Sequence, residues 1–272
     1  MNKQIKAILK YPGAKNRLAD WICSYIPKQH RVYLELFAGS CAVLLHKERS
    51  HIETINDLDG EVVNFFQVLR DDPEELSQQI LFTPYARDEY VNAYMDSNGD
   101  VERARRFCVK CWQGFGCGNL YRNGFKSGQQ SNSPNPARAW SELPENLLLM
   151  AERFKGVQIE NLPAVELLNR YDTEDVFIYA DPPYPHEIRK PHLYKHEMDN
   201  AEHEVLLKSL MDHPGKIMLS SYPNEMYDDM LSGWRRILKN TNAERGLRRT
   251  EVLYMNYSDE QISLFDYMRA TL

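Results

Sequence analysis

The sequence has no long hydrophobic run, because its longest unbroken apolar segments, such as 41–45 and 176–180, reach only five residues. A membrane helix needs about 20 consecutive apolar residues, so none is predicted. Segment 1–13 has neither the apolar core nor the small-residue cleavage site of a secretory signal. Five cysteines are an odd number for a chain of 272 residues and do not predict a disulfide framework. We therefore expect a cytoplasmic globular protein.

An excess of positive charge is also absent, since the net charge is −6 at neutral pH. An acidic protein is at first sight a poor partner for nucleic acid, but here the basic residues are concentrated. Segment 101–138 holds seven basic residues against one acidic residue, and segment 235–249 holds six against one. Such segments can create the local positive potential that a polyanion needs, although solvated helix faces would have the same composition. The net charge therefore does not decide whether the protein binds nucleic acid.

Strand-like and helix-like patterns alternate over the first third of the chain, and no internal repeat is visible. Segments 32–36 and 52–55 have strand composition, and a helix-like apolar pattern follows each of them. This order is typical of βαβ units. A further helix is predicted at 202–212, and further strands are predicted at 157–159, 176–180, 216–220, 236–239 and 251–257. These patterns predict an α/β fold built on a mainly parallel sheet.

The middle of the chain has a different pattern. Segment 72–150 is mainly helical in its apolar spacing, and from residue 114 to residue 135 it is rich in glycine and asparagine. Such a composition suits a loop or a hairpin. We therefore predict a sheet domain formed by residues 1–71 and 151–272, interrupted by a helical and hairpin domain at 72–150.

The sharpest local motif is Asp181-Pro182-Pro183-Tyr184, directly after the apolar strand at 176–180. Ligands of open α/β sheets bind beyond the carboxyl ends of strands, so this motif lies where chemistry is expected. Asp181 supplies a carboxylate acceptor, the prolines leave local carbonyls as acceptors, and Tyr184 offers a flat face for stacking a base. Two acceptors on an exocyclic amine favour its nucleophilic form as an electrophile approaches. The alternative is a turn that only ends the strand.

A glycine turn ends the first strand at Glu35-Leu36-Phe37-Ala38-Gly39-Ser40. The glycine lets the backbone approach a ligand, and the start of the following helix favours an anion. The dinucleotide pattern G-x-G-x-x-G is absent, which argues against NAD and FAD. Asp57 follows Gly39 by 18 residues, a spacing at which an acid can accept hydrogen bonds from ribose hydroxyls. Together these features predict an adenosine-containing cofactor that is not a dinucleotide.

Both motifs, together with Tyr11-Pro12-Gly13-Ala14-Lys15, resemble the Dam-type DNA adenine-N6 methyltransferase family, and the resemblance covers nearly the whole chain. Later segments at 194–198, 220–222 and 249–257 also look like family blocks. The resemblance implies a Rossmann-like fold that depends on S-adenosylmethionine, in which the insertion at 72–150 is the target-recognition domain. It implies site-specific methyl transfer to N6 of an adenine flipped out of double-stranded DNA. It also implies an enzyme encoded by a bacterium or a phage.

The resemblance assigns roles to individual residues. It implies cofactor binding by Tyr11, Gly13, Lys15, Phe37, Gly39, Asp57, Asn161 and Asp181. It implies catalysis by Asp181, Pro182, Pro183 and Tyr184. Lys15 is expected close to Asp181. We expect DNA contacts at Arg122, Asn123, Lys126 and Tyr194.

Two positions depart from the family pattern. Pro163 stands where family members often carry an acid, so the contact to the cofactor adenine is assigned to Asn161, Glu160 or the backbone. Gly39-Ser40-Cys41 stands in place of a Gly-x-Gly turn, which alters little if the backbone does the binding.

Other interpretations stay open on the sequence alone. An enzyme of the same fold could methylate RNA or a protein amide, and a homologue without activity could only bind DNA. Protein glutamine methyltransferases more often carry Asn-Pro-Pro-Tyr, and the basic insertion favours a nucleic-acid substrate. The presence of Lys15, Asp57, Asp181 and Tyr184 argues against a homologue without activity. Trp112 and Phe115 would either contact DNA or form a small aromatic core of the insertion. The recognition sequence and any restriction partner are not predicted.

No metal site is expected. The spacing of Cys108, Cys111 and Cys117 lacks a fourth ligand. We interpret four histidines after the 181–184 motif as polar loop residues near DNA: His186, His192, His196 and His203. We expect the protein to be a monomer in solution.

Overall fold

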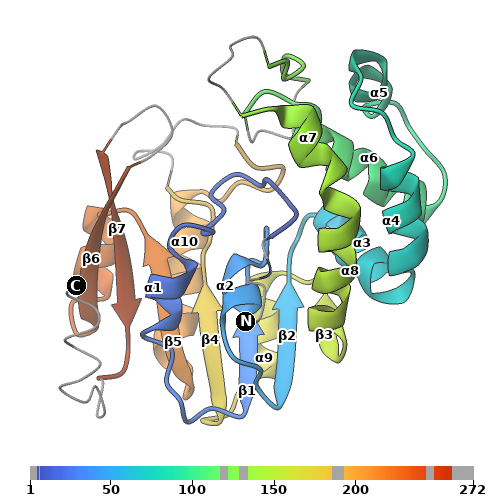
Figure 1. The fold of residues 1–272 in the computed structure, drawn as a ribbon. Coiled ribbons are helices and arrows are strands. Elements are labelled where there is room, and N and C mark those ends of the chain that lie inside the picture. Colours follow the sequence, from blue (N-terminus) through green and yellow to red (C-terminus); the bar gives the residue numbers. More distant parts are fainter. Residues whose placement is uncertain are drawn as a thin grey trace.

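A computed structural model describes residue 5 and residues 7–116, 122–128, 134–185, 193–242 and 248–258. Within these residues, seven strands form one sheet in the order β3-β2-β1-β4-β5-β7-β6 (Figure 1). Their bounds, in that order, are Val157–Glu160, Ile52–Asn56, Val32–Glu35, Val176–Ala180, Lys216–Ser221, Arg248–Met255 and Arg235–Asn242. The five strands from β3 to β5 are parallel, and β7 is antiparallel to both of its neighbours. This confirms the expected Rossmann-like, mainly parallel sheet.

Strand β4 lies at the centre of the sheet, and all five of its residues are buried. Side chains alternate between the two faces of a strand, so Phe177 and Tyr179 join one core while Ile178 joins the other. A strand covered on both faces has a continuous apolar sequence, which explains the run that precedes Asp181. Because Tyr179 lies beside Glu35 of β1, the carboxyl ends of β1 and β4 meet at one edge.

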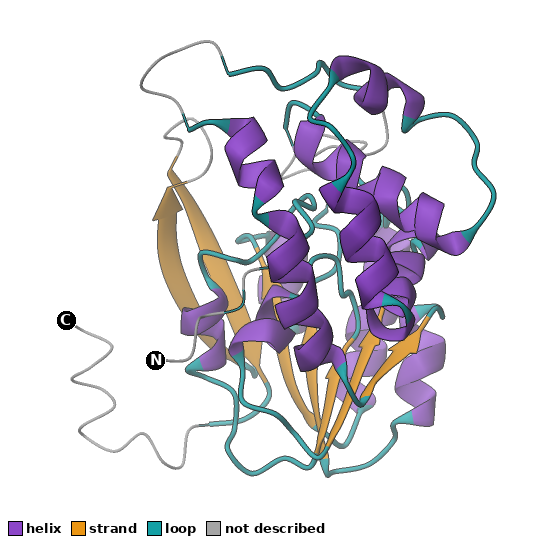
Figure 2. Ribbon diagram, turned by 45° about the vertical axis from the view of Figure 1, so that its right-hand side comes forward, coloured by secondary structure: helices purple, strands orange, loops and turns teal. Residues whose placement is uncertain are grey.

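Helices cover both faces of the sheet (Figures 1 and 2). The core on one face includes side chains of α1 (Ala19–Cys23), α2 (Ala42–His46) and α3 (Gly60–Asp71). The core on the other face includes side chains of α9 (Ala164–Arg170), α10 (Asn200–Asp212) and α11 (Glu225–Met230). None of the helices within the described residues is both long and apolar enough to cross a membrane.

Five helices form a group beside the β2–β3 end of the sheet (Figure 1). They are α4 (Pro73–Leu81), α5 (Arg87–Asn92), α6 (Asp100–Gln113), α7 (Pro136–Ser141) and α8 (Leu143–Phe154). Their buried residues belong to the same hydrophobic core that covers one face of the sheet. The two are continuous because α6 and α8 pack on α3. The expected boundary at residue 150 falls inside α8. This helix continues because its apolar face extends to Phe154, whose ring stacks on Phe66 at a centroid distance of 4.9 Å.

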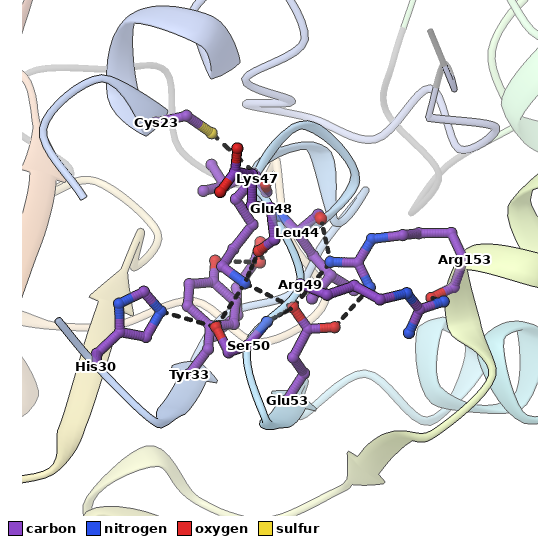
Figure 3. Close-up of polar contacts among 12 residues, drawn as sticks. Cys23, His30, Tyr33, Leu44, Lys47, Glu48, Arg49, Ser50, Glu53 and Arg153 are labelled. Carbon is purple, nitrogen blue, oxygen red and sulfur yellow. Dashed lines mark hydrogen bonds and ion pairs between the residues drawn. The ribbon is translucent and has the colours of Figure 1, made fainter. Parts of the chain in front are cut away.

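A buried polar cluster near the beginning of β2 joins α8 to the sheet (Figure 3). The Glu53 carboxylate of β2 accepts hydrogen bonds from Arg153 of α8 and from Lys47 after α2. Arg153 also donates to the backbone carbonyl of Leu44 at 2.8 Å. Burial alone would raise the pKa of Glu53, but the hydrogen bonds from Arg153 and Lys47 hold it below its usual value. Three elements are therefore joined through one carboxylate.

Candidate active site

A cavity of about 470 Å³ opens at the carboxyl ends of β1, β2 and β4. A volume of this size suits a small-molecule cofactor, because such pockets usually measure about 300–1,000 Å³. Several segments form its walls: 11–15, 35–40, 56–59, 162–165, residue 194 and 196–199. Seven of the expected cofactor residues line it, namely Tyr11, Gly13, Lys15, Phe37, Gly39, Asp57 and Asp181.

The turn after β1 is closed by Asp57. Its Oδ2 accepts a hydrogen bond from the Gly39 N–H at 2.8 Å, and its Oδ1 accepts one from the Asp59 N–H at 2.9 Å. Gly39 has a φ of +47°, and a Cβ there would lie 3.3 Å from the ring of Tyr11. Each carboxylate oxygen keeps a second lone pair for a ribose hydroxyl. Desolvation raises the pKa of Asp57 to about 6.

Cys41 takes the place of the second glycine in the family turn. It has a φ of +55°, in the left-handed region that glycine adopts at little cost. The fully buried Cys41 therefore keeps the turn geometry at the start of α2 without a glycine.

Asn161 does not line the cavity. Its side-chain amide instead donates to the backbone carbonyl of Asp57 at 2.7 Å and so fixes the loop that carries this acid. Four residues that follow Asn161 form an apolar wall of the cavity: Leu162, Pro163, Ala164 and Val165. With Pro163 in place of an acid, this part of the cavity offers a hydrophobic surface suited to the flat face of a purine.

Asp181 is held by two partners at the edge of the cavity. Lys15 Nζ lies 2.8 Å from Asp181 Oδ1 and 2.7 Å from Oδ2, and Ser220 Oγ of β5 donates to Oδ1 at 2.7 Å. Lys15 also donates to the Gly13 carbonyl at 3.1 Å. Burial alone would lower the pKa of Lys15, but Asp181 and Glu251 raise it above its usual value. Lys15 is therefore a fixed cation beside the carboxylate.

Tyr184 lies against this ion pair and is buried. Its hydroxyl donates a hydrogen bond to Glu251 Oε1, and its ring centroid lies 4.9 Å from Lys15 Nζ. The Tyr222 ring packs edge-on with Tyr184 at a centroid distance of 4.5 Å. Pro183 lines the cavity beside Asp181, whereas Pro182 is buried behind it. Of the four residues of the motif, Asp181 and Pro183 therefore form part of the cavity wall, and Tyr184 packs beside them.

Glu251 and Ser220 had no role predicted from the sequence, although both lie in segments that resemble family blocks. Glu251 lies on β7, which runs antiparallel, so the first half of β7 lies at the edge where the parallel strands end. The available signal was a single acid directly before an apolar strand segment, Val252-Leu253-Tyr254-Met255. Such a residue is buried only when it has partners.

Tyr194, which was expected to contact DNA, lines the cavity. Its ring is 6.1 Å from that of Tyr11, and its hydroxyl lies 2.5 Å from where a Cβ on Gly13 would be. Gly13 has a φ of +73°. Only glycine provides both the conformation and the space for this close approach.

The other three expected DNA contacts lie on a short hairpin after α6. An antiparallel bridge pairs Gly114 with Phe125, and this matches the predicted loop or hairpin. Tyr90 and Tyr85 fix the hairpin by donating to the backbone carbonyls of Asn123 and Lys126, each at 2.7 Å. The side chain of Arg122 is exposed, and Asn123 and Lys126 are half-buried.

Most of the positive charge on α6 is neutralised within the protein. Arg103 pairs with Glu61 of α3 at 2.7 Å, and Arg105 pairs with Glu89 of α5 at 3.0 Å. Arg106 pairs with Glu102 at 2.6 Å. These arginines hold helices together, and the exposed charge lies instead on residues such as Arg122 and Arg138.

The aromatic residues near the hairpin have separate environments. Trp112 is half-buried and donates to the Ile8 carbonyl at 2.8 Å, whereas Phe115 is 60% exposed.

Within the described residues, no three or more His, Cys, Asp or Glu side chains are grouped to hold a metal ion. Cys108 and Cys111 are buried thiols, and His203 accepts or donates a hydrogen bond with Tyr227 at 2.8 Å. Cys117, His186 and His192 lie outside the described residues.

The sheet topology and the Asp-Pro-Pro-Tyr motif at a cofactor-sized cavity are those expected of an amino methyltransferase. Residues 11–246 match the D12 class N6 adenine-specific DNA methyltransferase family. The chain belongs to this family, and it is an enzyme that methylates adenine in DNA. It is also similar to the Type II methyltransferase M1.LlaDCHI of Lactococcus lactis subsp. cremoris. The two are 26% identical over an alignment that covers 94% of this chain and 96% of that protein.

Proposed function

We propose that this enzyme transfers a methyl group from S-adenosylmethionine to N6 of an adenine flipped out of double-stranded DNA at a specific sequence. The observation that carries the proposal is the contact between Lys15 and Asp181 at the edge of the cavity. This contact connects segment 11–15, which contributes to the cavity, with the 181–184 motif, which would hold the target amine. We expect the enzyme to act as a monomer in the cytoplasm of a bacterial or phage-infected cell.

The cavity has the chemistry that S-adenosylmethionine requires. Asp57 offers carboxylate lone pairs to ribose hydroxyls, and the apolar wall at 162–165 together with Phe37 offers flat surfaces to the adenine. A side chain at Gly39 would crowd the Tyr11 ring beside the cavity. When bound, the cofactor supplies an electrophilic methyl group on a sulfonium sulfur.

The residues of the motif prepare the target amine. Asp181 and the neighbouring backbone carbonyl accept the two N6–H bonds, so the nitrogen lone pair turns out of conjugation with the ring. Lys15 and Ser220 hold Asp181 in place, so little reorganisation is needed when the base arrives. Tyr184 provides the aromatic wall for the flipped base. After transfer, the proton on N6 passes to Asp181 or to solvent.

We propose residues 72–150 as the target-recognition domain. The support is the exposed Arg122 on a hairpin that Tyr85 and Tyr90 hold in place, with Asn123 and Lys126 beside it. Arginine and asparagine are the side chains that read guanine and adenine edges, and lysine binds phosphates. This hairpin would therefore combine phosphate contacts with base contacts.

Labelled S-adenosylmethionine tests the proposal directly. The purified protein is incubated with double-stranded DNA, RNA or a mixture of proteins, and incorporated label is counted. We expect label in DNA alone, and methylation-aware sequencing should place it on adenine in one short sequence. Label in RNA or protein, or none in DNA, would contradict the proposal.

A further inference from the structure

Glu251 is a buried carboxylate that touches the catalytic motif from a strand far away in sequence. It is 3% exposed and lies on β7, separated from β4 by one strand, β5. Its Oε1 accepts the hydrogen bond of the Tyr184 hydroxyl and lies 3.6 Å from Lys15 Nζ. Burial raises the pKa of Glu251, although Lys15 acts in the opposite direction. A carboxylate in this environment costs free energy unless its partners compensate for it.

The first contact fixes the ring of Tyr184. The β4 strand holds the backbone before Tyr184, but the ring could still rotate about its side-chain bonds. The hydrogen bond to Glu251 fixes the far end of the ring, and Tyr222 packs edge-on with it. A ring that is fixed beforehand does not need to be ordered when a base binds.

The second contact acts on Asp181 through Lys15. Lys15 lies between two carboxylates, at 2.7 Å from Asp181 and 3.6 Å from Glu251. If Glu251 lost its charge, the whole attraction of Lys15 would fall on Asp181. Asp181 would then be a weaker acceptor for the target amine, because its charge would be more completely neutralised.

We propose that Glu251 is a positioning residue for methyl transfer, which orients Tyr184 and shares Lys15 with Asp181. This inference rests on the proposed function, since it concerns the same reaction. Glu251 does not touch the methyl group or the target nitrogen itself. It acts on the target base through Tyr184, and on the target amine through Lys15 and Asp181.

The first test is a single-turnover measurement on Glu251→Gln, a substitution that removes the charge and keeps the shape. We expect the rate constant for methyl transfer to fall by about 10-fold or more, as for a lost preorganising group. The dissociation constants for DNA and cofactor should change by less than about 3-fold, because Glu251 lies behind the contacting residues. When 2-aminopurine replaces the target adenine, its fluorescence in the complex with Glu251→Gln should differ from that in the complex with the parental enzyme, because the flipped base would be held differently.

Glu53→Gln provides a matched control. Glu53 is also a 3%-exposed carboxylate with a lysine partner, but it lies in the cluster of Figure 3 and does not line the cavity. A loss of folded protein lowers the amplitude of a single turnover, while the rate constant of the remaining enzyme is unchanged. We expect Glu53→Gln to affect amplitude only and Glu251→Gln to affect the rate constant.

Tyr184→Phe removes the same hydrogen bond from its other end and also tests the proposal if Glu251→Gln fails to fold. The double variant should lose less activity than the product of the two single losses, because the residues act together. The proposal would be overturned if Glu251→Gln had the parental rate constant. If only Tyr184→Phe folds, a parental rate constant for that variant would overturn the proposal. Fully multiplicative losses would overturn the link to Tyr184. If the parental enzyme itself did not methylate DNA, the proposed function would fail instead.

Discussion

Asp181 receives its two fixed partners from segments that lie far apart in the chain. Lys15 comes from the N-terminal segment and Ser220 from the end of β5. We predict that Asp181→Ala lowers methyl transfer by at least about 10²-fold, the scale of losing one preorganised group at a reacting centre. DNA affinity should change little, because the basic hairpin lies on another element. Rapid-quench assays and a DNA-binding titration measure the two effects separately, and methylation at the parental rate would show that the active site lies elsewhere.

Asp57 provides a prediction about pH. Its pKa is raised to about 6 by desolvation, so the carboxylate loses its charge as the pH falls through this value. Cofactor affinity should therefore decrease below about pH 6, since a charged acceptor binds ribose hydroxyls more strongly than a neutral one. Asp57→Asn should weaken binding by about 1.5–3 kcal/mol at neutral pH. Calorimetry over a pH series is the measurement, and a variant with the same pH dependence as the parent would exclude Asp57 as the titrating group.

Part of this site could be predicted from the sequence. The Asp181 motif and Asp57 stand next to strand ends, where local patterns place functional residues. Glu251 lies 70 residues after Asp181, and only the antiparallel direction of β7 brings it back to the same edge. Tyr194 was expected at DNA but faces the cofactor cavity, because its position depends on how the loop before α10 folds over Gly13.

At the scale of elements, α6 shows why charge counted along a sequence overestimates a basic surface. The acids that neutralise Arg103 and Arg105 lie on α3 and α5, at positions 61 and 89. Sequence composition over 101–138 includes the arginines and omits these partners. The surface available to phosphates is therefore smaller than the local charge of this segment indicates.

We predict that replacing Arg122 and Lys126 together with alanine weakens DNA binding. The slope of log K against log salt should become shallower by roughly 0.9 for each lost phosphate contact. Arg105→Ala is the matched control, because its charge is held by Glu89 and Glu102. It should cost about 1.5–3 kcal/mol of unfolding free energy and leave the salt slope unchanged. If the double variant kept the parental slope, the DNA-binding face would lie elsewhere, with 235–249 the next candidate.

For the whole molecule, alternating strand and helix patterns predicted the parallel part of the sheet and the helical character of 72–150. They did not predict that the two parts share one core. Helices α6 and α8 would be amphipathic whether they packed on the sheet domain or only on each other. Sequence periodicity does not reveal which partner covers their apolar faces. In the structure, both helices pack on α3, so the helical group is continuous with one face of the sheet.

The buried cluster around Glu53 joins these two parts, and it provides a prediction about stability (Figure 3). Arg153→Ala would remove two hydrogen bonds to the Glu53 carboxylate and the bond to the Leu44 carbonyl, and Lys47 alone would face a buried charge. Removing one partner of a buried pair costs about 3–5 kcal/mol when the other charge is left uncompensated, and because Lys47 still pairs with Glu53 we expect a loss at the lower end of this range. Urea unfolding measures this loss. Lys155→Ala is the control beside α8: its pair with Glu152 is exposed, so its loss should stay within about 0.5 kcal/mol. Equal unfolding midpoints for the two variants would show that the cluster does not join the helices to the sheet.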